Sequence, residues 1–476
     1  MPLILGTNSI KDSAYNVANS LRFNDGSSDH LTKTPSSAGN RRTWTFSVWV
    51  KKCMPLTGGN QRLIACGSGT GGLFSSIEYD SSDRIRILEG TEGGSSSVTV
   101  RGAGFNRDPS AWQHVVVKYD STQGTASDRI KIYLNGVEVT YDSTTYPSSN
   151  KDSEFNNTVV HTIGATSVGS SVGSFFDGYM AEVVLIDGQA LDPTSFGEFD
   201  EDSPTIWKPK DVSGLTFGTN GFYLDFENSG SLGADVSGNG NNFTVNNLTS
   251  IDQSTDTCTN NFCTMNPLTS TQDFNLSEGN LKLGASADNE VINGTLAGTI
   301  DNTNSGYYFE YKVNASNLGN NGEGFRMGIV NVDDIMLSPF TSARVLNVTN
   351  PALVYQTATN GGASRTDTDI GSASNGDIVM VAWKNGKVWL GVNGTFVNSG
   401  NPSAGSGEQF SGLSGEFIPF VMCSLTNGVN GSQFNFGNPT FSISSGNADA
   451  NGFGNFEYAP PTGFFALCTK NIAEIG

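Results

Sequence analysis

Acidic residues between Glu198 and Ser203 come closest to a catalytic pattern in this sequence. They are Glu198, Asp200, Glu201 and Asp202. Hydrolysis of a glycosidic bond uses two carboxyl groups that face each other across the bond. We expect these residues at the end of a short helix (191–199) and in the loop after it. That is not an apolar strand able to hold two carboxyl groups at a fixed distance. We therefore predict no catalytic residue here.

Nucleophilic catalysis is not indicated either. The three histidines, His30, His114 and His161, are scattered along the chain, and His114 falls inside an expected strand. No Gly-x-Ser-x-Gly motif stands between a strand and a helix, where it would expose a nucleophilic serine. We expect a protein that is not an enzyme.

Oxygen-bearing side chains alternate with glycines from residue 235 to residue 241. They belong to Asp235, Ser237, Asn239 and Asn241. Calcium takes six to eight oxygen ligands, and the glycines would let the backbone fold around an ion. The alternative is a plain turn, which uses Asn and Gly for their left-handed backbone conformation. Asp177 is a second candidate ligand, and no other cofactor is predicted.

Sugar recognition uses exposed aromatic rings together with amides and carboxylates. Trp207 and Tyr146 lie outside the strand patterns, so we predict them as candidate carbohydrate-binding residues. Four other tryptophans fall within or beside strand patterns and are expected in the core or at its rim: Trp44, Trp112, Trp383 and Trp389.

The six cysteines are too few for a disulfide framework in a chain of this length. Cys258 and Cys263 are close enough in sequence to pair, and free thiols are the alternative. A zinc site is not indicated, because there is no second cysteine pair and there are only three histidines.

The composition excludes several classes of protein. The formal net charge is −20 and no basic cluster occurs, so nucleic acid is not an expected ligand. No run of 18 apolar residues is present, so no membrane insertion is expected. The first residues lack the basic and apolar regions of a secretory signal. The 58 glycines, with many Asn, Ser and Thr, are typical of short strands joined by turns.

Alternating apolar residues predict an all-β fold. In residues 43–50, Trp44, Phe46, Val48 and Val50 share one face, as in a half-buried strand. Asn135-Gly136 between two alternating runs predicts a tight hairpin, and Asn385-Gly386 predicts another. Many short antiparallel strands indicate jelly-roll sandwiches.

The predicted domains are two tandem antiparallel β-sandwiches of the jelly-roll type. Residues 1–19 are an anchor or a disordered segment, and 20–200 form the first sandwich. A connector with a short β segment spans 201–265, and 266–476 form the second sandwich.

The first block resembles the laminin-G-like, or concanavalin-A-like, lectin and glucanase fold. Six motifs carry the resemblance in the family's order: residues 20–23, 46–50, 112–117, 132–136, 163–164 and 176–183. The family's hydrolases carry Glu-x-Asp-x-x-Glu on one strand, and the segment from Glu198 lacks the last Glu. The loop from Asp235 also resembles a loop of many laminin-G-like domains.

The second block resembles a SPRY-type domain. Residues 307–310, 327–329, 376–379, 389–395, 417–420 and 434–437 carry this resemblance.

The tandem of the two blocks is similar to structural proteins of marine tailed bacteriophages. The resemblance implies a tail or head fibre on the exterior of a virion, bound to other virion proteins. It would recognise host surface glycans or another receptor through sandwich-end loops, as a homo-oligomer, commonly a trimer. The alternatives are a structural decoration protein without a ligand, a glycan-degrading enzyme, and a module of a secreted bacterial adhesin.

Overall fold

The computed structural model describes residues 15–55, 58–69, 71–91, 94–168, 171–269, 275–284, 290–314, 325–335, 343–348, 353–358, 368–371, 374–423 and 430–476. The described chain falls into two compact units, an N-terminal unit that ends at Thr259 and a C-terminal unit that begins at Asn260. The N-terminal segment predicted as residues 1–19 lies mostly outside the described residues.

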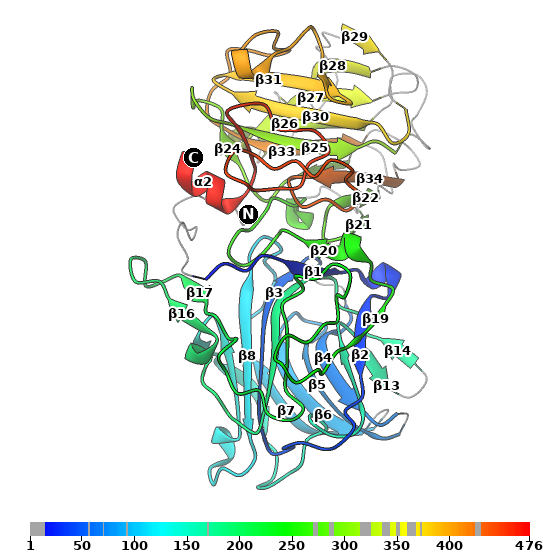
Figure 1. Cartoon of the computed structure of the whole chain (residues 1–476), viewed down its shortest axis with the longest axis vertical. Coiled ribbons are helices and arrows are strands. Elements are labelled where there is room, and N and C mark those ends of the chain that lie inside the picture. The colour runs from blue at the N-terminus through cyan, green and yellow to red at the C-terminus, as the bar shows by residue number, and fades with distance from the viewer. Residues whose placement is uncertain are drawn as a thin grey trace. The chain divides into compact units, whose positions relative to one another are not determined.

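The N-terminal unit is a sandwich of two antiparallel sheets (Figure 1). The first sheet has the order β10-β9-β8-β3-β15-β1-β20, and β18 also pairs with β15. Its strands are β1 (Ser20–Phe23), β3 (Thr43–Lys52), β8 (Gln113–Asp120), β9 (Ile130–Leu134), β10 (Val137–Glu138), β15 (Gly178–Asp187), β18 (Phe222–Leu224) and β20 (Gln253–Ser254).

The second sheet has the order β11-β7-β6-β5-β4-β12-β2-β19. Its strands are β2 (His30–Lys33), β4 (Gln61–Gly67), β5 (Leu73–Tyr79), β6 (Ile85–Thr91), β7 (Ser96–Gly102), β11 (Tyr141–Thr145), β12 (Val160–Ile163) and β19 (Thr244–Asn246). Two ribbons flank the sheets, β13 (Thr166–Val168) with β14 (Ser171–Gly173), and β16 (Gly197–Phe199) with β17 (Trp207–Pro209).

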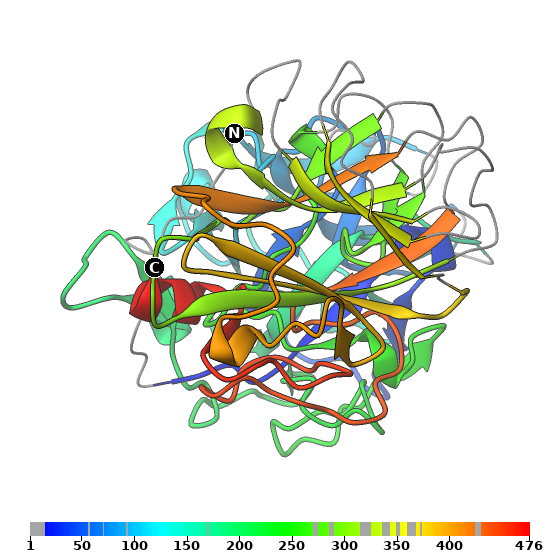
Figure 2. The ribbon, with the colours of Figure 1, turned by 90° about the horizontal axis from the view of Figure 1, so that it is seen from above.

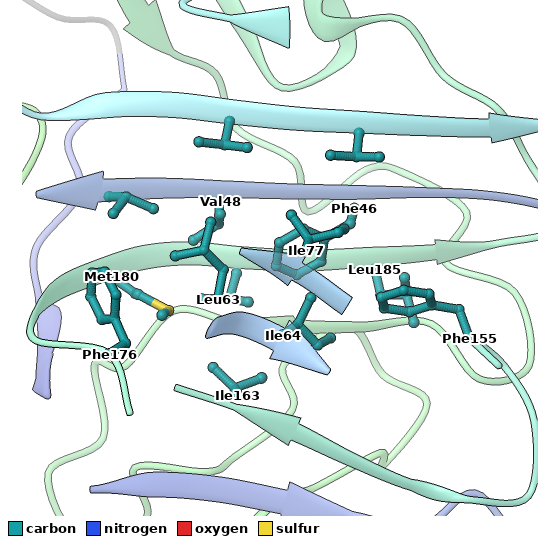
Figure 3. Packing of buried hydrophobic residues seen from close by; sticks show 14 of the residues in the cluster. Phe46, Val48, Leu63, Ile64, Ile77, Phe155, Ile163, Phe176, Met180 and Leu185 are labelled. Atoms are coloured by element: carbon teal, nitrogen blue, oxygen red, sulfur yellow. The ribbon is translucent and has the colours of Figure 1, made fainter. Parts of the chain in front are cut away.

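The core of this sandwich follows the predicted alternation. Trp44, Phe46, Val48 and Val50 of β3 all belong to one buried cluster. Figure 3 shows the same packing from close by, with Phe46 and Val48 pointing toward residues such as Ile77 of β5. Buried apolar area of this kind is the main stabilising contribution to such a fold.

The segment predicted as a connector belongs largely to the N-terminal sandwich. Strand β18 pairs with β15, β19 with β2, and β20 with β1. Residues up to Thr259 lie in this unit. The sequence does not predict this pairing, because three-residue strands between polar loops show too little alternation of apolar and polar residues.

The helix predicted over residues 191–199 is wrong. The structure has a 3₁₀ turn at Pro193–Ser195, followed by strand β16. Asp192 makes no side-chain capping bond and pairs with Lys118 instead. Pairing of β16 with β17 satisfies the backbone groups that a helix would have satisfied.

The C-terminal unit holds two further sheets. One has the order β21-β22-β34-β25-β30-β31-β32, with β35 parallel to β25. Its strands are β21 (Asn275–Ser277), β22 (Lys282–Gly284), β25 (Gly306–Lys312), β30 (Ile378–Lys384), β31 (Lys387–Val392), β32 (Thr395–Phe396), β34 (Asn430–Asn435) and β35 (Phe464–Ala466).

The other sheet of this unit has the order β23-β33-β26-β27-β28-β29, and β24 also pairs with β33. Its strands are β23 (Glu290–Asn293), β24 (Gly298–Thr299), β26 (Phe325–Asn331), β27 (Ala343–Val348), β28 (Leu353–Ala358), β29 (Thr368–Gly371) and β33 (Glu416–Cys423). The described α-helices are the short α1 (Val332–Ile335) and α2 (Thr469–Ile475), and Figure 2 shows α2 in red near the C-terminus.

Helices thus contribute little, and the chain is all-β as predicted. The predicted hairpin turns are confirmed, since Asn135, Gly136, Asn385 and Gly386 all have positive φ. Among the described residues, no helix is long and apolar enough to cross a membrane.

Candidate functional site

Loops from distant parts of the sequence meet beside the hairpin that joins β5 to β6. Asp80 forms this turn, because its Oδ1 accepts hydrogen bonds from the backbone N–H groups of Ser82 and Arg84 at 2.9 and 3.1 Å. Asp83 has a φ of 63°, a left-handed conformation that the turn imposes. The turn presents the side chains of Asp83 and Arg84 to the loop that follows β7.

That second loop, residues 103–112, is tied to the hairpin by Asp83. The backbone N–H of Asn106 and its Nδ2 both donate to the carbonyl oxygen of Asp83, at 2.8 and 3.1 Å. Arg107 Nε donates to Asp83 Oδ2 at 3.1 Å, and Lys52 Nζ at the end of β3 pairs with Oδ1. Burial lowers the pKa of Lys52 below its ordinary value, and the bond to Asp83 opposes that shift.

Phe105 stands at the centre of this arrangement with 53% of its surface exposed. The guanidinium carbons of Arg84 and Arg107 lie over its ring, 4.5 and 4.4 Å from the centroid. Cation–π contacts of this kind hold both guanidinium groups in place. An exposed aromatic ring with two ordered arginines is a combination suited to recognition.

Strand β11 adds a carboxylate to the same place. Arg101 donates to Asp142 from Nε and Nη2, at 2.9 and 3.1 Å, and from Nη1 to Asp80 at 3.2 Å. Arg84 pairs with Asp142 as well. The hydrogen bond from Arg101 holds the pKa of the Asp142 carboxyl below its ordinary value.

We call this set of side chains the end-loop cluster: Lys52, Asp80, Asp83, Arg84, Arg101, Phe105, Arg107 and Asp142. Its four cationic side chains face three carboxylates, which leaves one positive charge in a chain of net charge −20. Sequence reasoning missed this cluster. The only local signal was an aromatic residue between arginines in a Gly-rich loop, and neither Arg84 nor Asp142 is near it in sequence.

Trp207, predicted to bind sugar, is not available for stacking. Its side chain is buried at 7% exposure, and its Nε1 donates to Nδ1 of His114 at 3.0 Å. Phe199 packs edge-on against its ring, and a Cβ atom at Gly197 would lie 2.6 Å from the indole. The ring therefore fills a slot of the fold, and the prediction of a sugar platform at Trp207 is wrong.

Tyr146, the other predicted sugar-binding residue, lies half-buried against the main core of the N-terminal unit. Burial raises the pKa of its hydroxyl above the ordinary value. It does not belong to the end-loop cluster, and its role in binding stays a prediction.

The loop from Asp235 to Asn241 is closed by its own hydrogen bonds. Asp235 Oδ1 accepts from the backbone of Tyr223 and Ser237, and Oδ2 accepts from the backbone of Asn241 at 2.7 Å. The side-chain amides of Asn239 and Asn241 donate to backbone carbonyls of residues 218–221. The calcium site stays a prediction, and this donor set does not fit it well because the carboxylate is already used.

Asp177 is a separate residue, buried at 2% exposure, with its carbonyl oxygen accepting from Cys53 N. Asp177 directly precedes strand β15, whereas the Asp235 loop lies between β18 and β19. Among the described residues, no group of three or more His, Cys, Asp or Glu side chains is arranged to hold a metal. Cys258 and Cys263 do not form a disulfide bond.

Two of the four carboxylates considered for glycan hydrolysis are engaged in ion pairs. Glu198 lies on β16, and both it and Asp200 pair with Lys208, at 3.7 and 3.2 Å. Glu78 of β5, a buried acid outside that sequence segment, pairs with Arg62 and Arg86. Paired acids of this kind are structural, and they do not form the two opposed groups that hydrolysis uses.

The C-terminal unit has a hollow of about 460 Å³ at the β21 edge of its first sheet. Its described lining is mostly polar: Asn275, Leu276, Ser277, Lys282, Leu283, Gly284, Asn314, Gly431 and Gln433. At Gly431 the backbone passes close to the Asn314 side chain, since a Cβ atom there would lie 2.6 Å from Asn314 Nδ2. The volume is in the range of small-ligand sites, and the amide, hydroxyl and amine groups suit a hydroxylated ligand.

Part of the N-terminal unit is similar to a known family. The family model of the concanavalin A-like lectin/glucanases superfamily matches residues 25–195. That range holds most strands of the N-terminal sandwich and the complete end-loop cluster. No curated protein matches the sequence.

Solved structures are similar at low identity. A heptameric SAP-like pentraxin from Limulus polyphemus is 15% identical, with 37% of this chain and 80% of that chain covered and a TM-score of 0.28. Domains LG4-5 of the mouse laminin alpha1 chain are 11% identical, covering 89% and 90%, with a TM-score of 0.29. The SPRY domain of human HERC1 is 14% identical, covering 36% and 96%, with a TM-score of 0.26. The all-β sandwich of the N-terminal unit agrees with the match of residues 25–195 to the concanavalin A-like family model.

Proposed function

We propose that this chain is a non-enzymatic recognition protein that binds glycans through the loops at one end of its N-terminal sandwich. The observation that carries the proposal is the match of residues 25–195 to a lectin and glucanase family, in a range that contains the end-loop cluster with its exposed Phe105 ring. The engagement of Glu78, Glu198 and Asp200 in ion pairs favours binding over hydrolysis.

The biological setting of the proposal is the exterior of a tailed phage particle. The tandem of a laminin-G-like and a SPRY-like block supports this setting by resemblance. There the chain would contact other virion proteins and a host surface glycan, as a homo-oligomer such as a trimer. Several copies bound together would convert weak sugar contacts into useful avidity.

Binding of the purified full-length chain to whole host cells and to a glycan array tests the recognition function. We expect binding to a restricted set of glycans, with no release of reducing ends. Absence of binding to every cell and glycan would favour a structural decoration protein. Release of reducing ends that is lost on substitution of a carboxylate would favour an enzyme.

Electron microscopy of purified particles labelled with an antibody against the chain tests the setting. We expect label on a fibre or on the head surface, in a copy number that also gives the oligomeric state. Purified particles without label would overturn the virion assignment and leave the glycan-binding proposal in place.

A further inference from the structure

Arg84 and Arg107 hold hydrogen-bond donors that the protein does not use. A guanidinium group carries five N–H donors. Arg84 donates a hydrogen bond to Asp142 from one nitrogen, Nη1. Arg107 Nε donates a hydrogen bond to Asp83, and Arg107 Nη2 donates one to the carbonyl oxygen of Ser82 at 3.5 Å. Within the described chain, Arg84 Nη2 and Arg107 Nη1 make no hydrogen bond, and these nitrogens flank the exposed ring of Phe105.

The two guanidinium groups are ordered before any ligand arrives. Each has an ion-pair partner on one side and the Phe105 ring on another. Arg107 also keeps 39% of its side chain exposed, and Arg84 keeps 23%. A pre-ordered arginine loses less side-chain entropy on binding than a free one, so its remaining donors bind more strongly.

Free guanidinium donors recognise oxyanions. Arginine binds carboxylates and sulfate-like groups through paired, charge-assisted hydrogen bonds, with a geometry that lysine cannot reproduce. The exposed part of Phe105 offers an apolar surface beside those donors. A ligand that presents both an oxyanion and an aliphatic ring face matches this surface, and a charged sugar residue has both.

The net charge of the chain limits which kinds of anionic ligand could bind at the cluster. The cluster has one excess positive charge, while the chain as a whole carries −20. A dense polyphosphate such as nucleic acid would be repelled by the rest of the surface. A glycan whose negative charges are separated by neutral rings would place a single charge at the cluster at much lower cost.

We infer that Arg84, Phe105 and Arg107 form a binding site for an acidic glycan, one that carries carboxylate or sulfate groups. The inference rests on the proposed glycan-binding function and names its ligand class and its residues. The oxyanion lies against the free guanidinium donors, and the sugar ring packs on Phe105.

Biolayer interferometry with the full-length chain tests the site on three immobilised polysaccharides: a polyuronate, a sulfated galactan and an uncharged galactan. We expect the wild type to prefer one of the two acidic polymers, and the preferred polymer identifies the oxyanion. Arg107→Gln is expected to weaken that binding about tenfold, the loss of one charge-assisted contact. Arg107→Lys keeps the charge without the paired donors and is expected to weaken it as well.

Arg42→Gln is the matched control. Arg42 pairs with Asp152 and keeps 47% of its side chain exposed. It precedes β3 at Thr43, and Lys52 of the cluster ends this ten-residue strand, so the two positions are about 30 Å apart. Arg42→Gln removes the same charge and should change binding less than twofold. Thermal unfolding of each variant by circular dichroism confirms that the fold is retained.

The outcomes separate the inference from the function on which it rests. Equal binding to all three polysaccharides, or equal loss in Arg107→Gln and Arg42→Gln, overturns the acidic-glycan site and leaves glycan binding intact. Absence of binding to all three polysaccharides, to the array and to cells overturns both. If the wild type prefers an acidic polymer and Arg107→Gln binds that polymer equally well, the acidic ligand binds elsewhere on the chain and the proposed site is overturned.

Discussion

Two buried acidic groups, one in each unit, are held in different ways. In the N-terminal unit, Lys51 and Asp256 form an ion pair at 2.7 Å with both side chains fully buried. In the C-terminal unit, the buried carboxylate of Glu310 is held by uncharged donors instead: Tyr308 Oη, Asn435 Nδ2 and the backbone N–H groups of Glu457 and Tyr458.

The difference arises because the Lys51–Asp256 pair and Glu310 stabilise different kinds of structure. Lys51 is the next-to-last residue of the long strand β3, and its partner lies in the segment after β20, so opposite charges join two chain segments far apart in sequence. Glu310 lies in the middle of β25 and fixes an irregular loop, whose backbone N–H groups would otherwise be unsatisfied. Ion pairs connect strands at a distance, whereas a single carboxylate can order a loop.

The largest expected effect comes from breaking the buried ion pair. Asp256→Ala leaves the Lys51 ammonium buried without its partner and removes the acceptor of Trp112 Nε1. We expect a loss of about 3–5 kcal/mol in the free energy of unfolding. Urea denaturation of the full chain measures it. Asp152→Ala, at an exposed ion pair, is the control, and a loss below about 1 kcal/mol in Asp256→Ala would show that the pair is not as buried as described.

A second effect depends on pH and comes from Glu182 in the N-terminal unit. Burial raises the pKa of Glu182 to about 7, against hydrogen bonds from Tyr15 and Tyr223 that lower it. Asp225 and Glu227 add to the raised pKa. The folded state then binds a proton that the unfolded state has released, so this carboxyl makes the protein less stable as the pH rises from about 5 to above 7.

Glu182→Gln isolates this contribution. The wild type is expected to lose about 3 kcal/mol relative to the variant between pH 5 and pH 8. Unfolding free energies of both proteins at several pH values give the difference. Parallel pH profiles of wild type and variant would contradict a raised pKa at Glu182.

A smaller effect is expected at the uncharged cage of Glu310. Glu310→Gln keeps the shape of the side chain, but its NH2 group then faces backbone N–H groups of Glu457 and Tyr458 that need an acceptor. We expect a loss of about 2 kcal/mol, without the larger cost of an isolated buried charge. Hydrogen exchange should report faster exchange at the amides of Glu457 and Tyr458. Unchanged exchange there would remove Glu310 as the residue that orders this loop.

The smallest effect is expected at a surface pair of the same unit. Lys387 and Glu408 are 3.0 Å apart, with 28% and 24% of their side chains exposed. Glu408→Gln should change the free energy of unfolding by less than about 0.5 kcal/mol. A loss as large as that of Glu310→Gln would mean that exposure does not distinguish the two kinds of carboxylate.

Strands and hairpins could be predicted because their signals are local. Side chains alternate along a strand with a period of two, and the predicted run 43–50 became β3. The Asn-Gly turns need only two residues with positive φ. The three-residue strands β18 and β19 could not be assigned to the sandwich, because their partners, not their own sequence, make them part of it.

Recognition residues could not be predicted for a similar reason. Trp207 lies outside any strand pattern, but whether it is exposed depends on Gly197 and His114, which the fold brings around it. The end-loop cluster joins side chains from four chain segments, and sheet pairing alone places them together. An exposed aromatic residue next to arginine is a usable local signal only once neighbouring loops are known.

Hydrogen exchange of the full chain, with and without a bound acidic polysaccharide, tests the central claim most directly. We expect slower exchange in residues 80–84 and 103–107 when the glycan is bound, with exchange in residues 40–42 at the other end of β3 unchanged. Unchanged exchange at the end-loop cluster, or slower exchange confined to another part of the chain, would contradict recognition by these loops.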